Sequence, residues 1–488
     1  METEIKLHKG DMSDNGQVTI IDEDRLCYVV RSESRGASGL RTIPKAILEE
    51  YVNYIKSNPD VAPREAREAL SGKSEIDKYE YGYDSTILQM AKMVLGMVKT
   101  IHPAKSAVLH QDLHLDSEYM HYLTALRTKP FMLLAGISGT GKSRIVREMA
   151  KACWEKGDEE FGKNCPRNFR MVQVKPNWHD SSELIGYVSR LNGEKFVVGP
   201  FLHFLAAALK EPNVPYFLCL DEMNLAPVEQ YFAEYLSVIE SRKLNKESII
   251  ETDPIIPYEK TDAYESLIDQ LFDSSGERDA YKAEEGGKRL TIPQNLFVVG
   301  TVNMDETTFS FSRKVLDRAM TIEMNEVDLH GGLAKDSGNE IGYIGNSIIG
   351  DAAEGKDVYE ENKELCDEVL AYLEKVNNIL GGTPFKIAYR TRNEFLMYAV
   401  NRRKLAPDSQ LWQTLDEMTS MKILSRIEGD VDRTKNVLEG MQTLVKAEIE
   451  DLIPPAEEGK PKTESISAKK IKEMLAKLKD TGFTSYWA

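Results

Sequence analysis

The fold of this chain is decided by the stretch Gly136-Ile137-Ser138-Gly139-Thr140-Gly141-Lys142-Ser143, which has the form G-x-x-x-x-G-K-S. The apolar residues 131–135 before it predict a buried strand, and residues 144–150 after it have the spacing of a helix. Between a strand and a helix, glycines let backbone N–H groups surround a polyphosphate. The flanking elements argue against a chance glycine turn. We therefore predict a phosphate-binding loop.

The residues of this loop have separate expected roles. Lys142 is long enough to reach the terminal phosphates, and the Ser143 hydroxyl is suited to bind Mg²⁺. The N-terminus of the following helix adds a partial positive charge. The predicted nucleotide-binding residues are Gly136, Ser138, Gly139, Thr140, Gly141, Lys142 and Ser143.

A second apolar run, residues 216–220, ends in two acidic residues, Asp221 and Glu222. This pattern places both carboxylates at the C-terminal end of a buried strand, where ligands of open α/β sheets bind. Asp221 is suited to hold Mg²⁺ together with Ser143, and Glu222 is suited to polarise the attacking water. The alternative is a strand that ends in a solvated acidic turn, and the phosphate loop upstream argues against it.

A third strand, predicted over residues 295–303, ends at Asn303, which we expect to orient the water. The alternative is an asparagine that caps a loop. Arg313 and Arg318 follow on a predicted helix. Either is a candidate arginine finger for a neighbouring subunit, with Arg318 preferred. The alternative for these two is a surface arginine or a pair with Asp317.

Two further arginines, Arg390 and Arg392, begin a helix in the later part of the chain. A helical lid over the nucleotide would present one of them to the phosphates, so both are predicted nucleotide contacts. The alternative is again a pair of surface arginines.

Composition limits the class of protein. The chain has 488 residues, a formal net charge of −17 and five cysteines without a C-x-x-C pair. It contains no run of 18 apolar residues, and it begins with a polar, acidic segment. We expect a reduced, cytoplasmic protein without a membrane span, a disulfide framework or a zinc site. The acidic balance argues against general nucleic-acid binding, although it leaves room for a local basic channel.

The pattern of elements predicts four parts and the α/β fold class. Residues 1–100 form a small α+β domain, and residues 117–325 alternate strands and helices, which predicts a parallel sheet covered by helices. Residues 359–453 are helical and suit a lid, and residues 462–488 hold a lysine-rich helix and tail, expected to be a solvated amphipathic helix. Inside the α/β part, a hairpin is predicted around 187–200 with its turn at Asn192-Gly193, and the charged stretch 244–292 suggests a surface insertion.

The order of phosphate loop, acidic strand, asparagine strand, arginine helix and helical lid resembles that of AAA+ ATPases. The hairpin, Asp-Glu-Met-Asn at 221–224 and Gly-Thr-Val-Asn at 300–303 are similar to the MoxR/McrB branch, and most of all to McrB-type proteins. The resemblance covers about residues 120–435. It implies an AAA+ core with a helical lid, and the acidic pair and Asn303 match the family's positions.

The resemblance also implies an activity and partners. McrB-type proteins are the nucleotide-driven motor subunits of modification-dependent restriction systems, which implies GTP or ATP with Mg²⁺, a hexameric homo-oligomer, DNA and a separate McrC-type nuclease. The contacts to the base lie outside these motifs, so both nucleotides stay open. Val302 and Asp305-Glu306 depart from the family's signature around the asparagine, which leaves the GTP preference and the coupling to the nuclease open.

Two alternatives remain at this point. The N-terminal part either contacts DNA, with a basic loop at 31–41, or forms contacts between subunits. The whole chain is either a restriction motor or a MoxR-like ATPase chaperone that remodels a protein complex.

Overall fold

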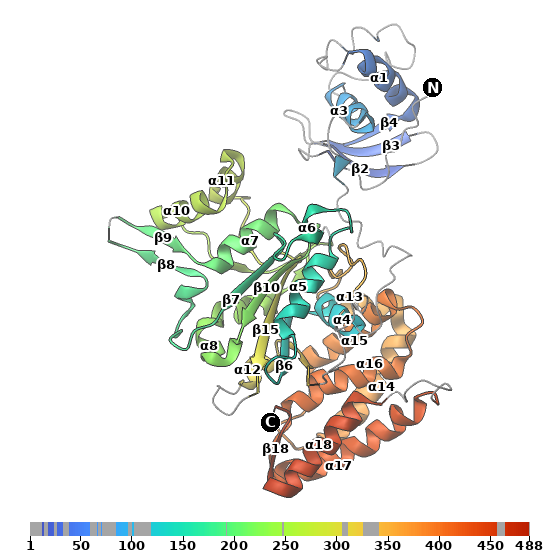
Figure 1. Ribbon diagram of the computed structural model, residues 1–488. Helices are drawn as coiled ribbons and strands as arrows, with labels where there is room; N and C mark the ends of the chain where they lie inside the picture. The colour runs from blue at the N-terminus through green and yellow to red at the C-terminus, as the bar shows by residue number, and fades with distance from the viewer. Residues whose placement is uncertain are drawn as a thin grey trace. The chain divides into compact units, whose positions relative to one another are not determined.

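The computed structural model divides the chain into two compact units, residues 1–108 and residues 109–488 (Figure 1). In the first unit it describes residues 12–13, 18–23, 27–32, 39–58, 66, 70, 84–95 and 100–101. In the second it describes residues 119–487 except 192, 246–247, 305–310, 326–340 and 456–463. The expected turn residue Asn192, the pair Asp305-Glu306 and the middle of the basic loop 31–41 lie outside the described residues.

The second unit is built on a five-stranded sheet in which every strand pairs in parallel with its neighbour. The strands lie in the order β16 (Met320–Glu323), β6 (Phe131–Gly136), β15 (Leu296–Asn303), β10 (Tyr216–Asp221) and β7 (Phe169–Gln173). The three central strands are almost wholly buried, as expected for apolar runs covered on both faces. Because the strands are parallel, the phosphate loop, Asp221 and Asn303 all come at the same edge of the sheet. The prediction of an α/β P-loop fold is confirmed.

Each face of the sheet packs into its own apolar core. One core joins alternate residues of the sheet, such as Met132 and Phe217, to α4 (Met120–Thr128), α5 (Lys142–Ala152) and the helices of the C-terminal part. The other core holds the remaining strand residues together with α7 (Pro200–Lys210) and the insertion. The helical lid thus shares a continuous core with one face of the sheet.

The C-terminal helices α14 (Lys363–Ile379), α15 (Tyr389–Leu405), α16 (Leu411–Met418), α17 (Val431–Glu448) and α18 (Ile466–Thr481) lie together in Figure 1. The lysine-rich helix α18 packs along α17, and β18 (Phe483–Ser485) after it pairs with β17 (Glu428–Asp430). Lys470 on α18 is buried and forms an ion pair with Glu323 of β16 at 2.8 Å. The last helix is therefore part of the lid and has one buried face.

A hairpin projects from the sheet domain beside two helices (Figure 1). Its strands are β8 (Gly186–Ser189) and β9 (Lys195–Val198), which agrees with the hairpin expected from the sequence. Helix α10 (Asp262–Leu271) of the insertion packs against β9, and Gln270 Nε2 donates a hydrogen bond to the Phe196 carbonyl at 2.8 Å. The insertion buries Leu267, Ile268 and Leu271. It is therefore part of the core of this unit and supports the hairpin, although its composition suggested a surface element.

The first unit is a small α+β structure. Its sheet has the order β4 (Gly39–Pro44), β3 (Cys27–Ser32), β2 (Val18–Glu23), β1 (Met12–Ser13) and β5 (Thr100–Ile101), with antiparallel pairing throughout. Helices α1 (Lys45–Ser57) and α3 (Asp84–Val94) form a separate apolar core around residues such as Tyr51 and Met90. Within the described residues of the whole chain, no helix has the length and apolar character that a bilayer crossing requires.

Candidate functional site

The phosphate loop connects β6 to α5. Gly139 and Gly141 have positive φ values of 87° and 85°, which lets the backbone curl so that its N–H groups can converge. Lys142 is 6% exposed, and its ammonium donates to the carbonyls of Gly136 at 2.9 Å and Ile137 at 2.7 Å. The carbonyls of the loop therefore hold the ammonium of Lys142 within the loop. Phosphate oxygens can take the place of these carbonyls as acceptors of its hydrogen bonds.

Residues at the end of β16 and directly after it pack against the phosphate loop. A Cβ atom at Gly136 would lie 2.4 Å from the Met324 carbonyl oxygen, so only glycine fits there. The Ile137 N–H donates to Asn325 Oδ1 at 3.0 Å, and Asn325 Nδ2 donates to Glu323 Oε1 at 2.6 Å. Sequence reasoning missed Asn325, because no motif marks it.

Asp221 lies beside the first turn of α5. Its Oδ1 atom accepts hydrogen bonds from Ser143 Oγ at 2.6 Å and from Thr301 Oγ1 at 2.8 Å. A carboxylate and a hydroxyl this close are hard oxygen ligands of the kind Mg²⁺ takes together with water and phosphate. The described residues contain no group of three or more His, Cys, Asp or Glu side chains that could hold a metal by themselves. Ser143 and Asp221 thus fit a Mg²⁺ that arrives with a nucleotide.

Glu222 has a strained backbone, with φ 54° and ψ 49°, in a region that few residues other than glycine adopt. Its N–H donates to Thr301 Oγ1 at 3.0 Å, and its Oε1 accepts from Asn303 Nδ2 at 3.1 Å. The structure therefore brings Glu222 and Asn303 together, as their predicted roles require. Thr301 contacts both acidic residues, and the sequence motifs did not indicate it. It lies two residues before Asn303 on β15, so the two side chains lie on the same side of the strand.

Arg318 lies at the opposite edge of the sheet from the phosphate loop. Met320 pairs with Met132 on β6, so Arg318 comes level with the start of that strand, while the loop begins at its end. At about 3.3 Å per residue, roughly 20 Å separate the two edges. Arg318 lies just beyond the short helix α12 (Arg313–Leu316), whereas the sequence suggested one continuous helix. In this position Arg318 does not reach the phosphate loop of its own chain.

The local contacts of these arginines differ. Arg318 Nε donates to the Leu236 carbonyl and its Nη1 donates to the Lys314 carbonyl, both at 2.8 Å. The Arg313 guanidinium lies over the Phe385 ring, 5.2 Å from its centre. Arg318 is therefore held by two carbonyl groups and Arg313 by one ring, and the role of arginine finger stays a prediction for each.

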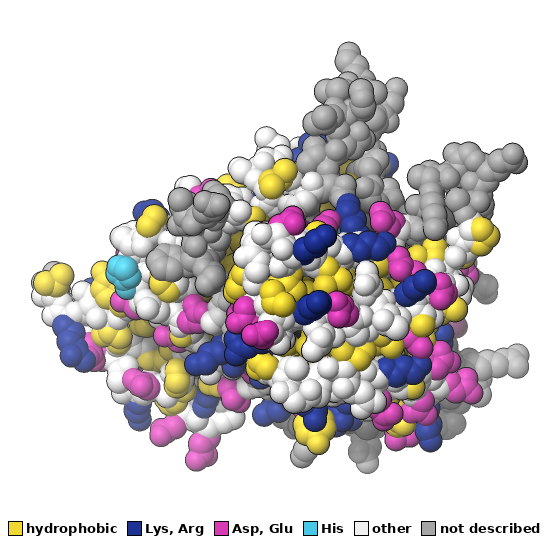
Figure 2. Space-filling model, turned by 90° about the horizontal axis from the view of Figure 1, so that it is seen from below, with side chains coloured by type: hydrophobic (Ala, Val, Ile, Leu, Met, Phe, Trp, Pro, Cys, Tyr) yellow, Lys and Arg dark blue, Asp and Glu magenta, His cyan; other side chains and the backbone are white. Residues whose placement is uncertain are grey.

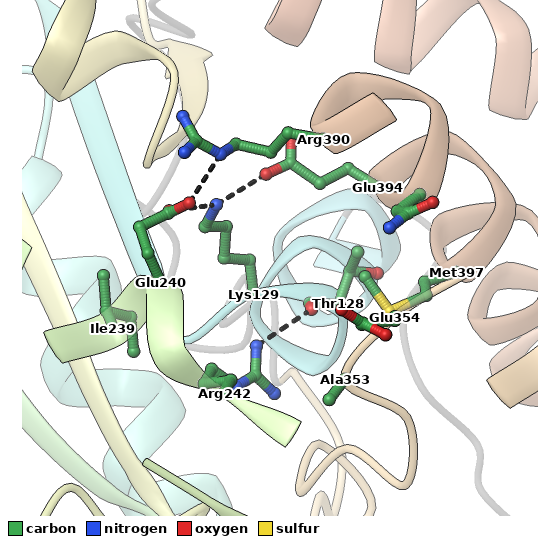
Figure 3. A pocket seen from close by; sticks show the side chains of 11 residues that line it. Thr128, Lys129, Ile239, Glu240, Arg242, Ala353, Glu354, Arg390, Glu394 and Met397 are labelled. Atoms are coloured by element: carbon green, nitrogen blue, oxygen red, sulfur yellow. Dashed lines mark hydrogen bonds and ion pairs between the residues drawn. The ribbon is translucent and has the colours of Figure 1, made fainter. Parts of the chain in front are cut away.

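Arg390 and Arg392 are not brought to the phosphate loop of their own subunit. Arg390 forms an ion pair with Glu240 at 2.5 Å, at the rim of a cavity of about 200 Å³ that Lys129 and Glu394 also line (Figure 3). Lys129 precedes β6, so this cavity is at the same edge as Arg318. Arg392 donates to its neighbour Asn393 at 2.8 Å and lies over the Tyr389 ring. The sequence pattern indicated the helix correctly, but it could not indicate which edge of the sheet that helix meets.

Comparisons with known proteins also point to a nucleotide-binding domain. Residues 131–270 match the AAA domain family (dynein-related subfamily), and residues 347–483 match a domain of unknown function. The type IV methyl-directed restriction enzyme EcoKMcrB subunit of Escherichia coli strain K12 is 22% identical over 306 residues, covering 59% of this chain and 57% of that protein. The chain thus spans little more than half the length of this curated relative.

A solved structure of a proposed ATPase from Cytophaga hutchinsonii matches with a TM-score of 0.34 and 15% identity, over 64% of this chain and 82% of that one. A likeness at this level carries no argument. The strand order, the phosphate loop and the AAA domain match show that the second unit contains an AAA+ P-loop domain, and the McrB relative shows that the chain is similar to McrB-type proteins.

Proposed function

We propose that this chain is the motor subunit of a restriction system: a homo-oligomeric ring, with six subunits expected, that hydrolyses GTP or ATP. The cycle would drive DNA translocation, activation of a separate McrC-type nuclease, or both. The observation that carries the proposal is the hydrogen-bonded set Ser143–Asp221 and Glu222–Asn303 at the end of the phosphate loop. The restriction role rests on the relative, whose name describes a methyl-directed restriction subunit.

The chemistry follows from the positions of these groups. A water beside Glu222 would give up its proton as it attacks the γ-phosphate, and Asn303 keeps the carboxylate in place. Lys142 and the loop N–H groups stabilise charge on the phosphates, and Mg²⁺ held by Ser143 and Asp221 would neutralise more of it. Arg318 or Arg313 of the neighbouring subunit would complete the site. A neighbouring subunit would thus be needed for turnover by Arg318, because this arginine lies at the far edge of its own sheet.

Contact with DNA requires a local basic surface, because the chain carries a net charge of −17. On the face shown in Figure 2, Lys and Arg side chains of the described residues alternate with Asp and Glu side chains. This mixed face is an unfavourable DNA surface. A channel formed by several subunits, or the first unit, is the better candidate.

The first test is the Glu222→Gln variant. It keeps the shape of the side chain and removes the base, so nucleotide binding should stay within about threefold while turnover falls at least about 100-fold. Binding is followed with a fluorescent nucleotide and turnover by phosphate release. The control is Glu259→Gln, which changes an exposed glutamate in the same unit and should leave both values unchanged. Normal turnover by Glu222→Gln would remove Glu222 from the reaction.

A second experiment separates the restriction motor from the MoxR-like chaperone. Turnover of GTP and of ATP is measured for the chain alone, with methylated and unmethylated DNA, and with a McrC-type nuclease from the same organism. Stimulation by DNA or by that nuclease is expected for a restriction motor. Turnover that responds to neither would overturn the restriction role and favour a chaperone.

A further inference from the structure

Three buried charged side chains join the lid to the sheet domain. Glu394 on α15 is 2% exposed, and its carboxylate forms ion pairs with Lys129 at 2.6 Å and with Lys422 at 2.8 Å. Lys129 precedes β6 and is 6% exposed, while Lys422 belongs to the lid and is 1% exposed. Figure 3 shows Lys129 extended between Glu394 and Glu240. The loss of hydration in a buried ion pair often outweighs the attraction between its charges, so such pairs are weak evidence for a role in stability alone.

Lys422 makes a second set of contacts, which indicates a further role. Its ammonium donates to the carbonyl oxygens of Ala319 at 2.8 Å, Asp317 at 3.1 Å and Leu316 at 3.4 Å. These carbonyls end α12, the helix that begins at Arg313, and they flank Arg318. A cation at the end of a helix satisfies carbonyls that have no partner within the helix. The lysine therefore fixes the segment that carries both candidate arginine fingers.

The backbone around Lys422 is unusual as well. Residues Thr419–Ile423 form a π-helix, a widened turn that is rare and is frequent at functional sites. Four residues after Lys422, Arg426 forms an ion pair with Asp317 at 3.1 Å. The lid thus holds the arginine segment through two side chains, one that binds its carbonyls and one that binds its carboxylate.

The charges in this cluster are those the contacts require. Burial alone would raise the pKa of Glu394, but Lys129 and then Lys422 outweigh it and hold the pKa below the usual range. Glu394 is therefore an anion. When Lys422 is removed, Glu394 keeps Lys129 as its partner, so the buried carboxylate is not left without a counter-ion.

From this geometry we infer that Lys422 is a positioning residue for hydrolysis in the neighbouring subunit. Lys422 connects the arginine segment 313–318 to the lid, and Glu394 pairs with this lysine and also with Lys129 of the sheet domain, so that a movement of the lid moves the arginines. The inference rests on the proposed function, because it requires that one of these arginines acts on a neighbour's nucleotide. It adds a named connection between the lid of one subunit and the reaction in the next.

The test uses the full-length Lys422→Met variant. Its own phosphate loop is unchanged, so nucleotide binding should stay at the level of the natural chain. Displacement of the arginine segment should lower turnover about 10- to 100-fold, the range expected for small errors in the position of a catalytic group. The matched control is Lys404→Met, which removes another lid lysine from an ion pair, with Asp351 at 2.7 Å, and should keep its turnover.

Mixed rings distinguish a positioning role from a structural one. A Lys422→Met subunit has a complete loop site but displaced arginines, whereas a Glu222→Gln subunit has well-placed arginines and no base. Mixing the two should restore turnover at sites that combine the loop of the first with the arginines of the second. The double variant Arg313→Ala/Arg318→Ala mixed with Glu222→Gln gives the reference recovery. If Lys422→Met does not fold, Arg426→Met replaces it, because it removes the other contact between lid and segment.

Each result has a definite meaning. Low turnover of Lys422→Met that recovers in the mixture supports the inference. Undiminished turnover of Lys422→Met overturns it, and so does a loss that fails to recover when the double arginine variant does recover. Either of these two results leaves the proposed function intact. Undiminished turnover of the double arginine variant itself overturns both the inference and the neighbour's role in the reaction.

Discussion

At the scale of single residues, one hydroxyl group connects both acidic residues of the site. Thr301 Oγ1 donates to Asp221 at 2.8 Å and accepts from the N–H of Glu222 at 3.0 Å. The same oxygen therefore orients the candidate Mg²⁺ ligand and supports the strained backbone of the candidate base. A buried polar group that loses its partner costs about 1–3 kcal/mol, so both contacts matter to the geometry of the site.

The Thr301→Val variant keeps the volume of the side chain and removes this hydroxyl. We expect kcat to fall about 10- to 100-fold, because a support of a metal ligand is lost, with a smaller change in nucleotide affinity. The control is Thr321→Val on β16, a buried threonine whose hydroxyl has no hydrogen-bond partner among the described residues. Equal losses in the two variants, measured by steady-state hydrolysis, would show that Thr301 serves packing alone.

The residues near the phosphate loop differ in how far the sequence could predict them. The motif and the position after a buried strand were enough to predict where three residues lie, because the strands before them are parallel. These residues are Lys142, Ser143 and Asp221. Asn325 could not be predicted, because its contact with Ile137 depends on how β16 aligns with β6. The structure does not bring Arg390 to the phosphate loop of its own chain, for a related reason. The sequence predicted the helix that carries Arg390, but tertiary packing sets where this helix lies against the sheet.

At the scale of elements, α4 connects the sheet to the lid through Arg127. This side chain has no solvent exposure, and it forms an ion pair with Asp351 at 3.0 Å and donates to Asn401 of α15 at 3.0 Å. Burial alone would raise the pKa of Asp351, but Arg127 and then Lys404 outweigh it and hold the pKa below its usual range. The charged form of Asp351 therefore stabilises the folded state.

Acid should weaken this connection. In the unfolded chain Asp351 binds a proton near pH 4, whereas in the folded chain it binds the proton at a lower pH. The contribution of Asp351 to the free energy of unfolding is therefore complete above about pH 4. It is lost as the pH falls through the pKa of the folded state. Asp351→Asn should lower the free energy of unfolding by about 3 kcal/mol at pH 7, and the difference should shrink below about pH 4. Urea denaturation at both pH values measures it.

The control for this experiment is Asp367→Asn, which changes an exposed carboxylate that accepts from the Tyr359 hydroxyl at 2.8 Å. Its effect should stay within about 0.5 kcal/mol at both pH values. A difference between Asp351→Asn and the natural chain that stays constant down to pH 3 would contradict an ionic role for Asp351.

The insertion at 244–292 shows what composition conceals about an element. Its charged residues suggested a surface segment, yet Tyr264, Leu267, Ile268 and Leu271 have the helical spacing of a buried face, and all four are buried. The spacing of these four residues indicates a buried helix face, which the average charge of the segment conceals. No pattern in the sequence could predict that α10 packs against the hairpin strand β9, because that contact joins segments about 70 residues apart.

At the scale of the whole molecule, the chain consists of two units whose apolar cores share no residue. The first unit has its own sheet and two helices around residues such as Ile47 and Ala91. All candidate residues for hydrolysis belong to the second unit. Removal of the first unit should therefore leave the candidate residues for hydrolysis in place.

A chain that lacks residues 1–108 tests this expectation. Residues 109–488 should bind and hydrolyse nucleotide within about threefold of the full chain, a difference of about 0.7 kcal/mol in activation free energy, because every element of the candidate site remains. If the first unit contacts DNA, the shortened chain should lose stimulation by DNA while its basal turnover continues. Basal turnover and its DNA dependence are measured side by side, with circular dichroism to verify folding. A folded 109–488 chain without basal turnover would show that the first unit contributes to the ring or to the site, and it would favour the subunit-contact role for that unit over DNA recognition.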